Sequence, residues 1–106
     1  MAFERLEILK KLIEQNPDES FNLYALGLEY LNIDKLESKT IFETLINKDP
    51  SFLASYYQLG SLLIELGQIA EALKVLKAGK IIAKAQNNHK TFNEINSLIL
   101  EIEFDV

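Results

Sequence analysis

Residues 49–79 read DPSFLASYYQLGSLLIELGQIAEALKVLKAG, and a related stretch precedes them in the same chain. Asp49-Pro50 lies 33 residues after Asn16-Pro17, and beyond Ile33 the offset between matching residues becomes 34. The matching pairs are Tyr24 with Tyr57, Leu26-Gly27 with Leu59-Gly60, Ser38 with Ala72, and Phe42 with Leu76. A period of this length indicates stacked two-helix units, none of which can bury its apolar face alone.

Length and composition describe one small domain. The chain has 106 residues, of which 48% are apolar. The amino terminus is charged from Glu4 onward, so it lacks the apolar segment of a secretory signal. No uncharged apolar run approaches the ~20 residues that span a bilayer. The chain has no cysteine, which suits a reducing compartment, and we expect a cytoplasmic protein without a membrane partner.

Charge is unevenly distributed along the chain. The net charge is −5, yet residues 73–90 have five basic and no acidic side chains, and residues 91–106 have four acidic and no basic ones. Helical spacing places Lys74, Lys77, Lys80 and Lys84 in one stripe. The overall acidity, the single arginine and the lack of aromatic residues among these lysines argue against nucleic acid. We interpret the stripe as a solvated face opposite the core.

Apolar spacing predicts six helices and no strands. Asn16-Pro17 and Asp49-Pro50 end the first and third helices, because the residue before proline avoids the α conformation. Gly67 is expected in the left-handed position after the fourth helix, and Asn87-Asn88 breaks the fifth. The expected ranges are about 3–15, 19–32, 35–48, 52–66, 69–86 and 90–103.

Side chains that cap helix amino termini are predicted at several of these boundaries. Asp18, Asp34 and Ser51 are the expected caps of the second, third and fourth helices. Residues 91–94, Thr-Phe-Asn-Glu, have the spacing of a capping box. The last helix is amphipathic, with one apolar stripe formed by Phe92, Ile95, Leu98, Ile99 and Ile102.

The second unit resembles a tetratricopeptide repeat. The residues that carry the resemblance are Tyr56, Leu59-Gly60, Leu63, Gly67, Ala72, Leu76 and Gly79, with Asp49-Pro50 at the boundary. The first unit departs from the pattern, since it lacks the turn glycine, has Ser38 where alanine is usual and has Leu45 where a small residue is usual, which implies wider helix spacing.

The resemblance implies an all-α, right-handed superhelix of two repeats. Its expected parts are an N-terminal half-repeat helix (1–17), repeats at 18–50 and 51–87, and a capping helix (88–106), all within one domain. This order is similar to that of small stand-alone bacterial tetratricopeptide proteins.

Catalytic and metal-binding patterns are not found, so we expect no enzyme, cofactor or metal. The chain has one histidine and no cysteine, whereas nucleophilic schemes need a nucleophile beside an oriented base. His89 lies in a predicted turn and has neither His-x3-His nor Glu-x-x-His spacing. The four glycines are scattered singly, so no phosphate-binding loop exists.

After catalytic and metal sites are set aside, the remaining candidate for a functional site is a binding surface. In the resembled fold the first helix of each repeat lines a concave groove. The residues that match the groove-facing positions are Phe21, Tyr24, Leu28 and Leu31 in one unit and Ala54, Tyr57, Ser61 and Ile64 in the next. Such an apolar, tyrosine-lined groove suits a peptide or an amphipathic helix of a partner protein. Family members that grip an acidic chain terminus use basic residues and asparagines here, so that activity is not implied.

Two functions stay open at this point. One is an interaction scaffold that binds a partner protein through the groove. The other is a self-assembling structural protein, for example a homodimer, that uses the same residues as an interface between copies. A terminal helix that covers the groove is a third arrangement of the same residues.

Overall fold

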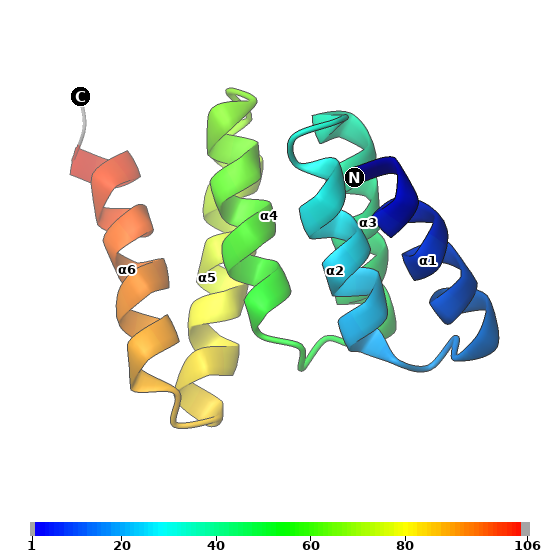
Figure 1. Ribbon diagram of the computed structural model, residues 1–106. Helices are drawn as coiled ribbons and strands as arrows, with labels where there is room; N and C mark the ends of the chain where they lie inside the picture. Colours follow the sequence, from blue (N-terminus) through cyan, green and yellow to red (C-terminus); the bar gives the residue numbers. More distant parts are fainter. Residues whose placement is uncertain (1, 105–106) are drawn as a thin grey trace. The chain divides into compact units, whose positions relative to one another are not determined.

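The computed structural model describes residues 2–104, which contain six α-helices and no strands (Figure 1). The helices are α1 (Ala2–Gln15), α2 (Ser20–Tyr30), α3 (Lys35–Lys48), α4 (Ala54–Glu65), α5 (Ile69–Ala85) and α6 (His89–Phe104). The number and order of helices predicted from apolar spacing are confirmed. The prolines also end helices as expected, since α1 stops at Gln15 and α3 at Lys48.

The chain divides into two compact units, Met1–Pro50 and Ser51–Val106. The division falls at the boundary that the sequence repeat placed between residues 50 and 51. The first unit holds α1, α2 and α3, and the second holds α4, α5 and α6. Each unit is described by itself below.

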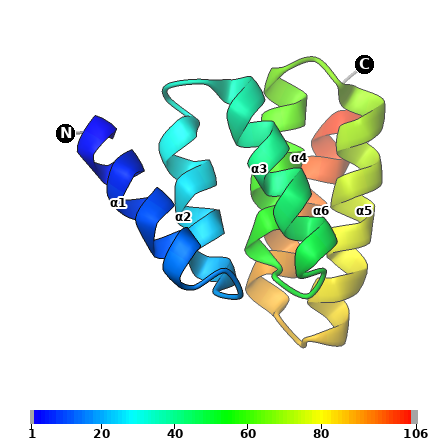
Figure 2. The same cartoon turned by 90° about the vertical axis from the view of Figure 1, so that its right-hand side faces the viewer.

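In the first unit α2 packs against α3 on one side and against α1 on the other (Figure 2). Gly27 makes the first contact possible, because a Cβ atom at this position would lie 2.6 Å from Cε1 of the buried Phe42. Ser38 is fully buried beside it, and its Oγ donates a hydrogen bond of 2.7 Å to the Gly27 carbonyl. Ser38 therefore stabilises the close crossing of α2 and α3, at a position where the repeat pattern usually has alanine. A second apolar cluster, of Leu6, Leu26 and Ile41, joins the three helices.

In the second unit α5 packs against both α4 and α6. A Cβ atom at Gly60 would lie 2.3 Å from Leu76 Cδ2, and one at Gly79 would lie 2.6 Å from Tyr56 Cβ. The glycines thus let α4 and α5 approach, as the repeat pattern predicted. The apolar stripe of α6 packs on the core of this unit as expected, and its members are Phe92, Ile95, Leu98, Ile99 and Ile102.

Left-handed backbone residues end two helices. Gly67 has a φ of 78° directly after α4, which confirms its predicted role. Asn87 has a φ of 57° after α5 and is the single non-glycine residue with positive φ among residues 2–104. Asparagine is the residue that tolerates this conformation best after glycine, so the predicted break at Asn87-Asn88 is confirmed.

One of the four predicted amino-terminal caps is confirmed. The Asp34 carboxylate accepts a hydrogen bond of 3.2 Å from the Glu37 backbone N–H at the start of α3. The cap of α2 is Glu19 and not Asp18, because α2 begins at Ser20 and the Glu19 carboxylate reaches the Phe21 N–H.

Two further cap predictions are wrong. Ser51 does not cap α4, because that helix begins only at Ala54, after a turn in which the Ser55 Oγ donates to the Phe52 carbonyl. The capping box at Thr91 is also wrong. Because α6 already begins at His89, Thr91 lies in its first turn, and its N–H donates to Asn88 Oδ1 at 3.1 Å.

Candidate functional site

The four predicted groove residues of the first unit all lie on or directly after α2. Phe21 is 61% exposed, and Tyr24, Leu28 and Leu31 are half-buried. The Tyr24 ring lies 5.9 Å from the ring of the buried Phe42 and 6.4 Å from the ring of Phe21, measured between centroids. Three aromatic rings thus lead from the core to the surface of this unit, each tilted against the next in a favourable geometry.

A groove between α1 and α2 extends this surface. It has a volume of about 360 Å³ and is lined almost wholly by apolar atoms. Its lining residues are Arg5, Ile8, Leu9, Ala25, Leu28 and Glu29. Only Leu28 among them was predicted as a groove residue. The signal that could have found the others is the exposed side of the first helix, where Ile8 stands among charged residues.

An ion pair borders this groove. Arg5 Nε donates to Glu29 Oε1 at 2.8 Å, with 62% of the arginine side chain and 22% of the glutamate side chain exposed. Glu29 is the one charged residue of α2, and this contact neutralises it. The outward side of α2 therefore presents apolar and aromatic side chains without an uncompensated charge.

The four predicted groove residues of the second unit all lie on α4. Ala54, Tyr57, Ser61 and Ile64 are half-buried. Tyr57 and Ile64 pack on the buried cluster that includes Leu53, Leu76 and Ile95. These two side chains therefore contribute to the core of the unit as well as to its surface.

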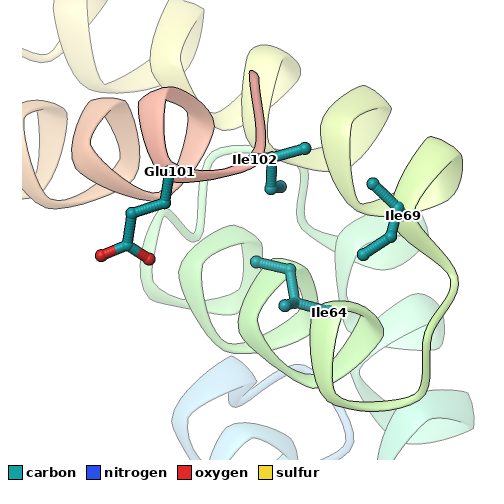
Figure 3. A pocket seen from close by; sticks show the side chains of 4 residues that line it. All are labelled: Ile64, Ile69, Glu101 and Ile102. Atoms are coloured by element: carbon teal, nitrogen blue, oxygen red, sulfur yellow. The ribbon is translucent and has the colours of Figure 1, made fainter. Parts of the chain in front are cut away.

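Helix α6 approaches one end of this surface. Ile64 of α4, Ile69 of α5 and Ile102 of α6 converge on a pocket of about 190 Å³ (Figure 3). Glu101 stands at its edge with its carboxylate directed away from the three isoleucines (Figure 3). The capping helix thus approaches α4 at Ile64.

The lysine stripe of α5 is not wholly a solvated face. Lys74, Lys77 and Lys84 are exposed, and Lys77 Nζ lies 3.4 Å from Glu103 Oε2 of α6. Lys80 is partly buried, with its Nζ 5.4 Å from the centre of the Phe92 ring, a cation–π distance. Two of the four lysines therefore contact α6, and Lys80 is the one that departs from the solvated face expected from the sequence.

In the part of the chain that the structure describes, neither a metal-binding group of side chains nor a membrane-spanning helix is found. His89 is the first residue of α6, so the predicted turn at this position is wrong. Within residues 2–104 no three His, Cys, Asp or Glu side chains come together in a way that would hold a metal ion. No helix in this range is both long enough and apolar enough to cross a bilayer.

Comparison with known proteins gives the same fold. A sequence profile described as "Tetratricopeptide repeat" matches residues 41–74. A tetratricopeptide repeat domain protein from Salinibacter ruber, solved by crystallography, is 27% identical with a TM-score of 0.79, and the match covers 83% of this chain and 100% of that one. The solution NMR structure of such a domain from the same organism gives 29% identity and a TM-score of 0.78 over 83% of this chain and 90% of that one.

A more distant neighbour shares the fold alone. The TPR2B domain of yeast Sti1, solved as a complex with pHsp70, is 20% identical with a TM-score of 0.85, covering 95% of this chain and 82% of that one. No curated protein matches the chain significantly. These matches confirm the predicted all-α tetratricopeptide solenoid fold.

Proposed function

We propose that this chain, which belongs to the tetratricopeptide repeat family, is a protein-interaction module that binds a peptide or helix of a partner protein in an apolar groove. Members of this family are generally interaction modules without catalytic function. In our proposal the chain is accordingly not an enzyme. The absence of cysteine suits a reducing compartment, and we place the interaction in the cytoplasm.

One observation carries the proposal: the outward side of α2 is apolar and aromatic where a surface helix normally carries charge. Phe21 is 61% exposed and rests against Tyr24, which is itself supported by the buried Phe42. An exposed aromatic side chain on a preorganised base loses little conformational entropy when it binds. Aromatic anchors of this kind dominate the energetics of protein interfaces.

The binding surface that we propose comprises the groove-facing positions of both repeats. These are Phe21, Tyr24, Leu28 and Leu31 in the first repeat and Ala54, Tyr57, Ser61 and Ile64 in the second. Tyr24 and Tyr57 occupy equivalent places in the two repeats and offer the same large, rigid contact with a hydroxyl group. A partner with large apolar side chains at helical or extended spacing fits such a surface.

The test is affinity capture of partners from cytoplasmic extract with the immobilised chain. The groove variant is Phe21→Glu/Ser61→Glu, which avoids Tyr24 and Tyr57 because both rings also pack on the cores of their units. The control variant is Lys74→Glu/Lys84→Glu, which leaves the two lysines that contact α6 unchanged. Circular dichroism establishes that each variant is folded.

We expect the groove variant to lose the captured partners and the control variant to keep them. Retention by the groove variant together with loss by the lysine variant would place binding on α5 and refute the proposal. Light scattering on the purified chain addresses the alternative that the same residues join two copies. A stable dimer that the groove variant dissociates would favour that alternative.

A further inference from the structure

Exposed apolar side chains gather on the two terminal helices. Ten large hydrophobic residues in the described part of the chain are markedly exposed. Three of them, Phe3, Ile8 and Leu12, lie on α1, and two, Leu100 and Phe104, lie on α6. Half of the exposed apolar residues thus belong to two helices that make up less than a third of the chain. The exposed residues of α1 and α6 are not part of the α2 and α4 surface proposed above, although the α1–α2 groove shares Leu28 with it.

The repeat register explains the exposed side of α1. With Pro17 matched to Pro50, Ile8 corresponds to Ile41 and Leu12 to Leu45 of α3. Ile41 is 7% exposed and Leu45 is fully buried, whereas Ile8 is 58% and Leu12 is 36% exposed. The same positions of the repeat are therefore buried in α3 and exposed in α1. Helix α2 packs on both helices, but it is the first helix of the repeat of α3, whereas it belongs to the repeat after that of α1.

The open side of α1 has the form of a binding site for a helix. Like α3, α1 has the place of a second helix in a repeat. Helix α2, the first helix of the α3 repeat, packs on α3, whereas within the first unit no first helix of the same repeat packs on α1. The groove of about 360 Å³ between α1 and α2 marks this place, with Ile8 and Leu9 on one wall and Ala25 and Leu28 on the other. A stacked repeat would fill it with the first helix of the preceding unit.

Helix α6 has the place of a first helix in a repeat, and within residues 2–104 no second helix packs on it as α3 packs on α2. It follows α5 and packs on it as α2 follows and packs on α1. On the side opposite the core its residues recur at helical spacing as Asn93, Ser97, Leu100 and Phe104. Leu100 is 45% and Phe104 is 76% exposed. Ser97 is small, as are Gly27 and Gly60 at the places where α2 and α4 cross their second helices.

We propose that α6 of one copy occupies the α1–α2 groove of a second copy, so that the two chains together complete one repeat. In the antiparallel arrangement of a repeat, Ser97 faces Leu9 as Gly27 faces Phe42. Leu100 then packs against Ile8, and Glu101 approaches Arg5. The charges do not oppose this pairing, because residues 91–106 have four acidic and no basic side chains, whereas α1 has three acidic and three basic ones. Arg5 already pairs with Glu29, so Glu101 would share that arginine.

This contact is heterologous, since two different surfaces meet. A heterologous contact that does not close into a ring adds copies one after another. One helix pair buries less area than a standard stable interface, so the association is expected to depend on concentration.

The experiment is sedimentation velocity on the whole chain between about 10 μM and about 1 mM, where weak interfaces dissociate and form. The α1 variant is Ile8→Glu/Leu12→Glu, and the α6 variant is Ser97→Arg/Leu100→Glu. The control variant, Leu36→Glu/Ile81→Glu, changes two equally exposed apolar residues away from both surfaces. Each terminal variant keeps one of the two complementary surfaces intact.

We expect the average mass of the parent and the control to rise with concentration above the 12.1 kDa of one chain. Each terminal variant alone stays at 12.1 kDa, and an equimolar mixture of the two gives a heterodimer of twice that mass. Recovery of association on mixing also shows that both variants are folded. A parent that remains monomeric throughout overturns the proposal. So does a terminal variant that dimerises alone, because that result indicates a symmetric contact.

Discussion

Replacement of Gly60 by valine tests the close crossing of α4 and α5. Gly60 and Leu76 face each other where α4 meets α5, and Leu76 is fully buried. A Cβ atom at position 60 would lie 2.3 Å from Leu76 Cδ2 and 2.5 Å from Leu76 Cγ. Carbon atoms in ordinary contact are about 3.5–4.0 Å apart. Leu76 or one of the two helices must therefore move.

The expected loss follows from two opposing effects. Overpacking of a closed core costs about 1–3 kcal/mol, and valine lies at the upper end because it adds two methyl groups beyond Cβ. The better helix propensity of valine over glycine returns a few tenths of a kcal/mol. We expect Gly60→Val to lower the free energy of unfolding by about 2–3 kcal/mol. Ala78→Val, at an exposed position of α5, should lose only about 0.5 kcal/mol.

Urea unfolding followed by circular dichroism measures these losses, with an unchanged m-value as the sign that the unfolding reaction is the same. A double-mutant cycle then isolates the contact. Leu76→Ala alone opens a cavity and should cost about 2–5 kcal/mol, but it also makes room for the valine that replaces Gly60. The double variant should therefore be at least about 1 kcal/mol more stable than the two losses added together. Additive losses, or a Gly60→Val variant as stable as Ala78→Val, would refute this reading of the crossing.

Three further predictions concern a buried hydrogen bond, a helix cap and the last helix. Ser38→Ala should cost about 0.5–1.5 kcal/mol in urea unfolding, because it removes the hydrogen bond to the Gly27 carbonyl and fills the site no better; a loss above that range would mean that the serine also sets the helix spacing. Asn88→Ala should cost about 1 kcal/mol through loss of the α6 cap at Thr91 N–H, and Asn88→Asp should restore most of it. Truncation after Asn88 uncovers Leu76, Ala83 and their neighbours, so light scattering at about 10 μM, where the parent is expected to be monomeric, should show association and the melting temperature should fall; an unchanged monomer would show that α6 does not protect this surface.

The helices of this fold could be predicted because their limits depend on local chemistry. Asn16-Pro17 ends α1 through the restriction that proline places on the preceding residue, whatever the rest of the chain does. Gly67 is needed wherever a helix ends in the left-handed conformation, and the structure gives it a φ of 78°. The small residues of the second repeat mark helix crossings for a similarly general reason, since only they let two backbones approach.

The caps could not be predicted equally well, because several polar residues stand near each helix start. Asp18 and Glu19 compete at α2, and the choice depends on whether the helix begins at residue 19 or at Ser20. At α4 the turn of residues 51–53 delays the helix to Ala54, which leaves Ser51 too far away. A shift of one or two residues in the start of a helix decides which residue caps it, and helix propensity does not resolve such a shift.

The candidate site shows the same limit at the tertiary level. The residues on α2 followed from the repeat pattern, but the support of Tyr24 by Phe42 depends on how α3 crosses α2. The groove that includes Ile8 and Ala25 depends on how α1 lies against α2. Within one helix the sequence indicates which residues share a face, and it does not state which face of the next helix they meet.

The first repeat departs from the family pattern at two matching positions together. In the second repeat the large Tyr56 meets Gly79, whose absent Cβ leaves room for the tyrosine. The matching positions of the first repeat are Leu23 and Leu45, two side chains of middle size, and Leu45 is fully buried. Two leucines occupy more volume than one tyrosine and one glycine, but neither leucine has a ring that needs the space left by an absent Cβ atom. The first repeat therefore needs no small residue at position 45, because the aromatic residue that would require one is absent from position 23.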